Sequence, residues 1–315
     1  MLRTFSGLVL AAVVALVPTS VLPSGPAGAA APALCFGRPV TIDLNKPGAP
    51  DPDRPRADVV LGTPGADLIR TGGGEDTVCA GDGKDRVFLG DDKDTGYGGR
   101  GADLLDGGGR SDHLYGGTGD DVIRGREGWD QLEMVDLAKG DDRVYGGVGN
   151  DTFRNANPGD VYLGGDGGDY FTDANDCTDC GSAVITYLGG PGKDLAVSGA
   201  GVEIVEGGDG ADTVSYVGVG EDGGPGVTVD LAVDGPQDTG PGGTDTLVDV
   251  ENLVGTSGGP DVLSGDDGPN RIAGSNGPDQ LYGRGGDDDL EGGDGLDLCD
   301  GGTGTNQFMD CEETL

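Results

Sequence analysis

Aspartates recur at every ninth residue over long stretches of the chain. From Gly62, eight consecutive nonamers run to Glu133, and their sixth residues are Asp67, Asp76, Asp85, Asp94, Asp103, Asp112, Asp121 and Asp130. Carboxylates in such a strict register suit a hard cation, and Ca²⁺ takes about six to eight oxygen ligands. One carboxylate per turn does not complete that shell. The spacing therefore predicts ions shared between neighbouring turns, with peptide carbonyls as further ligands.

The same nine-residue frame returns after each interruption. Three extra residues at 134–136 shift it, and an insert around Cys177 and Cys180 interrupts it again; ADVVL at 57–61 fits it with Asp58 but lacks the glycines. The later sixth positions are Asp142, Asp151, Asp160, Asp169, Asp194, Glu203, Asp212, Asp261, Asn270, Asp279, Asp288, Asp297 and Asn306.

The residues around each Asp also repeat. Glycine prevails at positions one, two and four, where it allows left-handed dihedrals and close carbonyl approach. A large apolar residue stands at position eight throughout the first array, except at Gly96. A disordered Gly/Asp-rich tail would explain the composition but not this register.

The pattern resembles the RTX nonapeptide GGxGxDxUx of the hemolysin-type calcium-binding repeats. That resemblance implies an all-β fold, a right-handed parallel β-roll (β-solenoid) of nine-residue repeats. Each repeat would give a six-residue calcium-binding turn and a three-residue strand, forming two short-stranded parallel sheets with calcium-binding turns on both edges. Two repeats would complete a coil, so Asp67 would stack on Asp85 and Asp103, and Asp76 on Asp94 and Asp112. The expected cofactor is multiple Ca²⁺, and the expected ligands are Asp67, Asp76, Asp85, Asp103, Asp121, Asp130, Asp142, Asp151, Asp169, Asp194, Asp212, Asp261, Asp279, Asp288 and Asp297.

Some repeats depart from the family pattern at position four. Asp92, Arg110 and Pro158 replace its glycine, which makes Asp94, Asp112 and Asp160 weaker ligand candidates. Glu203 is longer by one methylene, and Asn270 and Asn306 offer oxygen without charge.

The composition limits both the partners and the source of stability. Of 315 residues 68 are Gly, only 5% are aromatic, and the net charge is −38, which excludes nucleic acid as a partner. A core of one apolar side chain per repeat does not offset a backbone ordering cost of about 1–2 kcal/mol per residue. Metal binding must contribute the difference, so we predict a fold triggered by calcium. The only histidine, His113, excludes zinc sites built on several imidazoles.

The frame divides the chain into segments. Residues 1–33 form the expected signal peptide, with Arg3, an apolar run at 8–17 and small residues up to Ala33; no later segment is long and apolar enough to span a membrane. An N-terminal cap at 34–61 precedes the roll at 62–172. A Cys-containing insert (173–188), repeats at 189–215, a segment at 216–255, the roll at 256–309 and a C-terminal disulfide cap at 310–315 follow.

Two of these segments leave alternatives open. Val227, Val229 and Leu231 alternate with polar residues as in a half-buried strand, so 216–255 forms either wider coils of the same solenoid or a separate domain. Six cysteines in an exported chain favour three disulfides. Their order suggests Cys35–Cys79, Cys177–Cys180 and Cys299–Cys311, although the CxxC at 177–180 also occurs in redox sites.

Three functions from different classes follow. The leading one is a secreted, non-enzymatic calcium-binding protein that serves as an extracellular structural or surface module. The second is an adhesin-like module in which calcium rigidifies a surface that binds glycan or the cell envelope. The third is a polysaccharide hydrolase or epimerase. HExxH is absent, so the protease activity of some family members does not carry over. The oligomeric state stays open.

Overall fold

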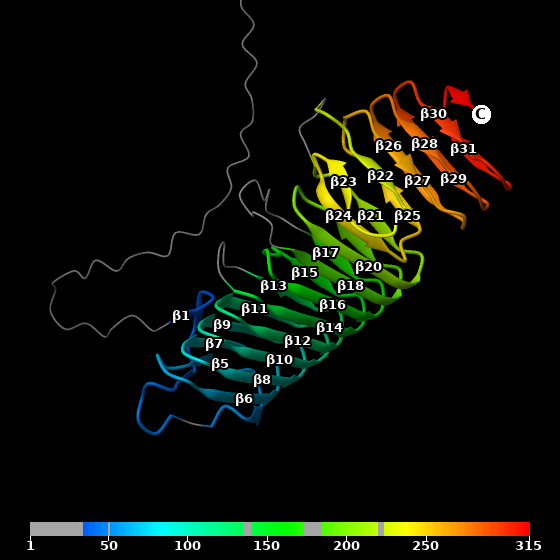
Figure 1. The fold of residues 1–315 in the computed structure, drawn as a ribbon. Helices are drawn as coiled ribbons and strands as arrows, with labels where there is room; N and C mark the ends of the chain where they lie inside the picture. Colours follow the sequence, from blue (N-terminus) through cyan, green and yellow to red (C-terminus); the bar gives the residue numbers. More distant parts are fainter. Residues whose placement is uncertain (1–33, 50, 135–139, 173–183, 220–223) are drawn as a thin grey trace, which may run out of the picture. The chain divides into compact units, whose positions relative to one another are not determined.

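A computed structural model describes residues 34–49, 51–134, 140–172, 184–219 and 224–315. Within these ranges the chain is all-β, with strands and turns and without a helix. Over most of the chain, successive strands alternate between the two sides of a solenoid and pair in parallel with the strands of neighbouring coils (Figure 1). The predicted parallel solenoid of nonapeptides is thereby confirmed.

A 14-stranded sheet, here called the long sheet, runs through the whole solenoid. Its strands, in spatial order, are β3 (Ile42–Asp43), β5 (Val59–Leu61), β7 (Thr77–Asp82), β9 (Thr95–Arg100), β11 (His113–Thr118), β13 (Gln131–Glu133), β15 (Thr152–Arg154), β17 (Tyr170–Thr172), β19 (Leu195–Val197), β21 (Thr213–Ser215), β25 (Asn252–Val254), β27 (Arg271–Asn276), β29 (Asp289–Asp294) and β31 (Gln307–Met309).

Two sheets share the other side of the solenoid. The opposite sheet has 11 strands: β4 (Arg54–Pro55), β6 (Leu68–Gly73), β8 (Arg86–Asp91), β10 (Leu104–Gly109), β12 (Val122–Glu127), β14 (Arg143–Val148), β16 (Val161–Asp166), β18 (Ile185–Gly192), β20 (Glu203–Gly210), β24 (Gly243–Val248) and β23 (Gln237–Gly240). The terminal sheet has five: β22 (Thr228–Asp230), β26 (Val262–Ser264), β28 (Gln280–Tyr282), β30 (Leu298–Asp300) and β32 (Glu313–Thr314). A small pair, β1 (Leu34–Cys35) and β2 (Arg38–Pro39), lies at the N-terminal end.

The eighth residues of the repeats form the core, because side chains alternate across a strand and position eight points inward. In the pairing of β10 with β12, Leu105 stands opposite Ile123, and both are fully buried. The seventh and ninth residues of these two strands are half-buried. Larger rings thicken the core further along, where Phe153 stacks on Phe171 with ring centroids 4.6 Å apart.

The strands are longer than the expected three residues. Most strands of the first array contain six, as in β10, because pairing continues from position seven through position three of the next repeat. The chain bends inside such a strand at the position-two glycine; Gly108, for example, has a φ of +109°. The turn proper is therefore only positions four to six.

The segment at 216–255 contributes strands to the solenoid. Strand β24 pairs with β20, and β25 pairs with β21, so the long sheet continues without a gap. On the other side of the solenoid, the opposite sheet ends in this segment. Strand β22 pairs with β26 and so begins the terminal sheet. Strand β18 begins at Ile185, inside the expected insert at 173–188, whose Cys177 and Cys180 lie outside the described residues.

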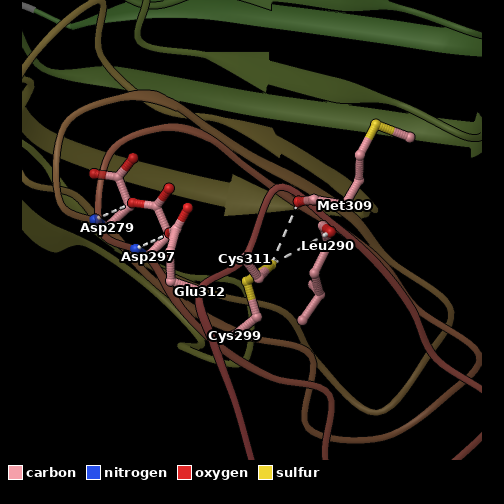
Figure 2. The surroundings of a disulfide bond; sticks show 7 residues. All are labelled: Asp279, Leu290, Asp297, Cys299, Met309, Cys311 and Glu312. Atoms are coloured by element: carbon pink, nitrogen blue, oxygen red, sulfur yellow. Dashed lines mark hydrogen bonds between the residues drawn. A yellow bond between two sulfur atoms is a disulfide. The ribbon is translucent and has the colours of Figure 1, made fainter.

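Disulfides join each end of the solenoid to a neighbouring coil, as expected. Cys35 is bonded to Cys79, which fastens the β1–β2 pair to strand β7. Cys299 is bonded to Cys311 and brings the last residues against β30, where β32 adds a strand (Figure 2). The expected signal peptide at 1–33 lies outside the described residues.

Candidate metal centre

The sixth-position side chains form ladders along the edges of the solenoid. The backbone N–H of each sixth residue donates to a carboxylate oxygen of the sixth residue one coil further along. In the long-sheet ladder the nitrogen–oxygen distances are 2.7–2.9 Å, and the members are Asp58, Asp76, Asp94, Asp112, Asp130, Asp151, Asp169, Asp194, Asp212 and Glu251.

Two shorter ladders follow the other edge. The opposite ladder has distances of 2.7–2.8 Å and joins Asp67, Asp85, Asp103, Asp121, Asp142 and Asp160. The terminal ladder, at 2.8 Å per step, joins Asp261, Asp279, Asp297 and Glu312. On the long-sheet edge, a further row joins Asn270, Asp288 and Asn306 at 2.9 and 3.0 Å. Turns two repeats apart therefore stack on one edge.

Asp94 and Asp112 occupy the long-sheet ladder in the same way as their neighbours. The residues that replace the position-four glycine in their repeats adopt the backbone conformation that glycine would take: φ is +82° at Asp92 and +72° at Arg110. These two side chains also form an ion pair at 3.5 Å across adjacent coils. The local irregularity thus leaves the placement of both aspartates unchanged.

In the interior of the ladders, one carboxylate oxygen is bonded and the other is not. The Oδ1 atoms accept the backbone N–H, whereas the buried Oδ2 atoms lack a hydrogen-bond partner among the described residues at Asp85, Asp94, Asp103, Asp112, Asp130, Asp151, Asp169, Asp194, Asp212, Asp279, Asp288 and Asp297. Leaving a buried acceptor unsatisfied costs about 1–3 kcal/mol, and more for a charged group. A row of such atoms points to a missing partner of positive charge.

The glycine at position one lies where these oxygens gather. A Cβ added to Gly125 would lie 2.1 Å from Asp130 Oδ2 and 2.8 Å from the carbonyl oxygen of Gly146 in the next coil. At Gly164 the corresponding distances are 2.1 Å to Asp169 Oδ2 and 2.6 Å to the Gly189 carbonyl oxygen. Carboxylate and peptide oxygens therefore converge on a space that only glycine leaves open.

This donor set fits calcium better than a side-chain metal site. Within the described ranges, no three His, Cys, Asp or Glu side chains gather around one point. A complete shell must therefore include peptide carbonyls, and hard oxygen donors of this kind are the ligands that Ca²⁺ prefers.

At several ladder ends, protein groups satisfy the carboxylate instead. Thr63 donates its backbone N–H and its hydroxyl to Asp67, at 2.6 and 3.0 Å. Thr256 does the same for Asp261, with a backbone contact of 2.8 Å. Arg54 and Arg56 form ion pairs with the fully buried Asp58 at 2.9 and 3.0 Å. These ends are closed without a metal.

Other sixth positions interrupt the ladders. The Asp160 carboxylate accepts from the Tyr162 hydroxyl at 2.7 Å, and the next position in its row is the buried Ile185. Glu203 donates its N–H to Asp245 at 3.3 Å. Asn270 donates its amide to the Glu251 carbonyl, which ends the long-sheet ladder there. Asn306 accepts from the N–H of Asp288 at 3.0 Å and so occupies a ladder position.

Burial raises the pKa of the ladder carboxyls, although the backbone hydrogen bond opposes this shift. The pKa rises to about 8 at Asp112 and to about 7 at Asp94, Asp130 and Asp169. Desolvation disfavours the charged form, and like charges along the ladder add to it. Without a cation, these groups therefore bind protons near neutral pH.

Sequence reasoning missed three members of these rows. Asp245 is the sixth residue of GPGGTDTLV (240–248), whose proline at position two hid the match, and its buried side chain accepts from Tyr216 and Thr239, each at 3.0 Å. Glu251 and Glu312 continue the long-sheet and terminal ladders with a longer carboxylate. Figure 2 shows Asp279, Asp297 and Glu312 in succession beside the Cys299–Cys311 disulfide. A search that accepted Glu at position six would have found the last two.

A comparison with protein-family models identifies these turns. The model of the RTX calcium-binding nonapeptide repeat matches more than half of the chain, at residues 55–87, 80–105, 106–133, 138–154, 186–215, 255–290, 264–299 and 274–308. The chain belongs to this family. RTX repeats are calcium-binding and typical of secreted bacterial proteins, in keeping with the two described disulfides.

The residues matched by the RTX model include ladder members on both edges of the solenoid. No curated protein matches the chain. In the described part of the RTX chain, no helix is long and apolar enough to cross a membrane. His113 lies on the outer face of the long sheet, where its ring nitrogens contact Glu133 at 3.2 Å and Tyr115 at 3.3 Å.

Proposed function

We propose that the chain is an extracellular, non-enzymatic module that folds when calcium binds between its stacked turns and then serves as a structural or surface component. The single observation that carries this proposal is the row of buried, unpaired Oδ2 atoms, which at Asp130 and Asp169 lie beside position-one glycines. Bound calcium would supply positive charge and link adjacent coils there.

The proposed ligands are the ladder-interior aspartates with an unpaired Oδ2, together with peptide carbonyls of the glycine turns. The remaining predicted ligands are not equivalent. Asp67 and Asp261 already have protein donors on the carboxylate, so we propose that they bind calcium weakly or not at all. The ligand role of Asp76, Asp121 and Asp142 stays a prediction, and their ladder position supports it.

Electrostatics supports coupling of this site to folding. Aligned carboxylates repel one another in a chain of net charge −38, and a cation between coils removes that repulsion. Since a preformed site does not exist in an unfolded chain, metal-binding free energy contributes directly to folding. We expect affinities nearer the roughly 10⁻⁴–10⁻³ M of extracellular calcium modules than those of cytosolic buffers.

A calcium titration of the mature protein at neutral pH tests the proposal. Circular dichroism and sedimentation velocity would report β-structure and compactness, with magnesium as the control. A cooperative gain of both signals with calcium, and not with magnesium, is the expected result. A chain that stays equally compact and trypsin-resistant in chelator would overturn it.

A further inference from the structure

Four arginines on the outer face of the opposite sheet lie outside every described ion pair. They are Arg70 on β6, Arg86 on β8, Arg124 on β12 and Arg143 on β14. Neither an ion pair nor a side-chain hydrogen bond holds their guanidinium groups within the described residues. By contrast, Arg100 and Arg126 each bind a carboxylate at 2.6 Å. Unpaired arginines are unexpected in a chain where 57 acidic residues face 19 basic ones.

The four arginines form two copies of one arrangement. On β8, Phe88 lies at position nine and Arg86 at position seven. On the neighbouring strand β6, Arg70 is the register partner of Phe88. The guanidinium carbons of Arg70 and Arg86 lie 5.0 and 5.6 Å from the centre of the Phe88 ring. The Phe88 ring therefore has two cations beside it and remains only half-buried.

The second copy has an aromatic residue and two arginines at the equivalent positions, and one of these arginines lies over the ring. On β14, Tyr145 lies at position nine and Arg143 at position seven, and Arg124 is the register partner on β12. Arg124 lies 5.6 Å from the Tyr145 ring centre. Three strand pairings separate β8 from β14, which is about 14 Å at about 4.8 Å per pairing. We call these six residues the arginine face: Arg70, Arg86, Phe88, Arg124, Arg143 and Tyr145.

At positions seven and nine, the neighbours of the arginine face are mostly apolar. The remaining outward residues at positions seven and nine of β6, β10, β12 and β16 are Leu68, Leu104, Asp106, Val122, Val161 and Leu163. Asp106 is the only acid among them, and Arg126 neutralises it at 2.6 Å. Leu68 is 56% exposed. Positions seven and nine thus carry cationic and apolar side chains, while the exposed acids Asp91, Glu127 and Asp166 stand at position three of the same sheet.

We propose that the arginine face binds a carboxylate-bearing polysaccharide laid along the solenoid. The guanidinium fork matches a carboxylate in geometry and charge. Half-buried aromatic rings offer flat apolar surfaces on which a sugar ring packs. An extended chain of pyranose units advances about 5 Å per unit, close to the spacing between neighbouring strands of about 4.8 Å. Successive sugars therefore meet successive strands, and acidic sugars meet the arginines.

This inference rests on the proposed function, because the six residues come together only when the coils are stacked. Tracking folding by circular dichroism separates the two. A chain that folds without calcium contradicts the proposed function, while binding at the arginine face is still measured on that folded chain.

The test is isothermal titration of the full mature chain in saturating calcium with short oligogalacturonates, which are carboxylated and too short to gel. Neutral galactan oligomers and polyglutamate serve as comparison ligands. The key variant is R70Q/R86Q/R124Q/R143Q. The control R100Q/R110Q/R154Q/R271Q removes the same charge from arginines that already hold carboxylates.

We expect oligogalacturonate binding that weakens with salt and is lowered on the order of ten- to hundredfold by the key variant, since exposed charge pairs contribute modestly and four are lost. The control should change affinity less than about threefold. Replacing both rings, F88L/Y145L, should weaken binding about three- to tenfold while folding stays intact.

Three outcomes would overturn the inference. The wild-type chain binds no oligogalacturonate, or the control variant loses as much affinity as the key variant, or polyglutamate binds as tightly as the sugar. The last outcome would assign the face to acidic polypeptides instead.

Discussion

The Leu89 side chain occupies the space that Gly96 leaves in the core. A Cβ on Gly96 would lie 3.1 Å from Leu89 Cδ1, and both residues are buried. They belong to the same nonamer, 89–97, in which a leucine stands at the usual glycine position and a glycine at the usual apolar position. The two departures from the repeat therefore compensate each other.

Substitutions that exchange the side-chain sizes of Leu89 and Gly96 test this relationship. Gly96→Leu alone should destabilise the calcium-loaded protein by about 1–3 kcal/mol through overpacking, and Leu89→Ala by about 2–5 kcal/mol through a cavity. The double change L89G/G96L should recover most of the loss, because it restores the ordinary repeat. Urea unfolding in saturating calcium gives the free energies; a double variant whose loss equals the sum of both single losses would contradict the packing argument.

Asp279→Asn and Asp261→Asn form a matched pair on one ladder. Asp279 has an unpaired Oδ2, whereas the Asp261 carboxylate accepts from Thr256. We expect D279N to raise the calcium midpoint of folding several-fold, since it removes a ligand charge. D261N should leave the midpoint close to wild type. Equal shifts in both variants would show that the unpaired oxygen does not identify the ligand.

Gly125, at position one of the 125–133 repeat, should be required for calcium binding there, and Gly109, at position three of the 107–115 repeat, should not. Gly125→Ala places a methyl 2.1 Å from Asp130 Oδ2, whereas at Gly109 the nearest neighbour of an added Cβ is Asp91 Oδ1 at 3.9 Å. We expect G125A to raise the calcium midpoint and to lower stability by more than about 1 kcal/mol, and G109A to do neither. Comparable calcium titration curves for the two variants would show that the space beside Gly125 is not needed for calcium binding.

The metal-free coil should be more stable in acid than at neutral pH. The carboxyls of Asp85, Asp94, Asp112 and Asp130 have pKa values raised to about 6–8, against about 3.9 in an unfolded chain. A raised folded pKa gives stability that is fully present below about pH 4 and is lost as the pH rises through 6–8. Circular dichroism in chelator should show more β-structure at pH 5 than at pH 8, and calcium affinity should rise over the same interval. A circular dichroism signal for β-structure in chelator that grows from pH 5 to pH 8 would contradict the expected direction of the pH dependence.

Removing the C-terminal disulfide should loosen the last coil only. Cys299 and Cys311 close a loop of 12 residues, for which the expected loss is about 3 kcal/mol. In C299S/C311S, amide exchange should accelerate in β31 and β32, while β7 and β9 keep their protection. Acceleration throughout the solenoid would show that the disulfide supports more than its own coil.

The sequence predicts the stacking of the coils well, because the nine-residue frame places the core, the edges and the bends. Position eight gives the core, position six gives the edges, and the glycines give the bends, so the stacking of Asp67 on Asp85 follows from counting. Strand length does not follow, because pairing beyond the position-two glycine depends on the neighbouring coil. The exchange between Leu89 and Gly96 is also invisible in a residue-by-residue reading, since each departure alone looks like a defect.

The candidate site is less predictable than the fold. Frame counting places the aspartates but does not show which oxygens are already bonded, so Asp67 and Asp130 look alike in sequence. Thr63, which satisfies Asp67, occupies a position where threonine carries no family signal. Asp245 and Glu251 lie between clear arrays, where proline and glutamate break the consensus.

The change of sheet between β24 and β22 divides the solenoid into two stacks of coils that share only the long sheet. Coils on either side share the long sheet, but their other strands belong to different sheets, and among the described residues no hydrogen bond to a carboxylate joins the opposite ladder to the terminal ladder. Under mechanical load, unfolding that starts at one end of the solenoid should stop at this change of sheet before the second stack of coils unfolds. Pulling the loaded chain from its termini would then give two force peaks instead of a single continuous peeling.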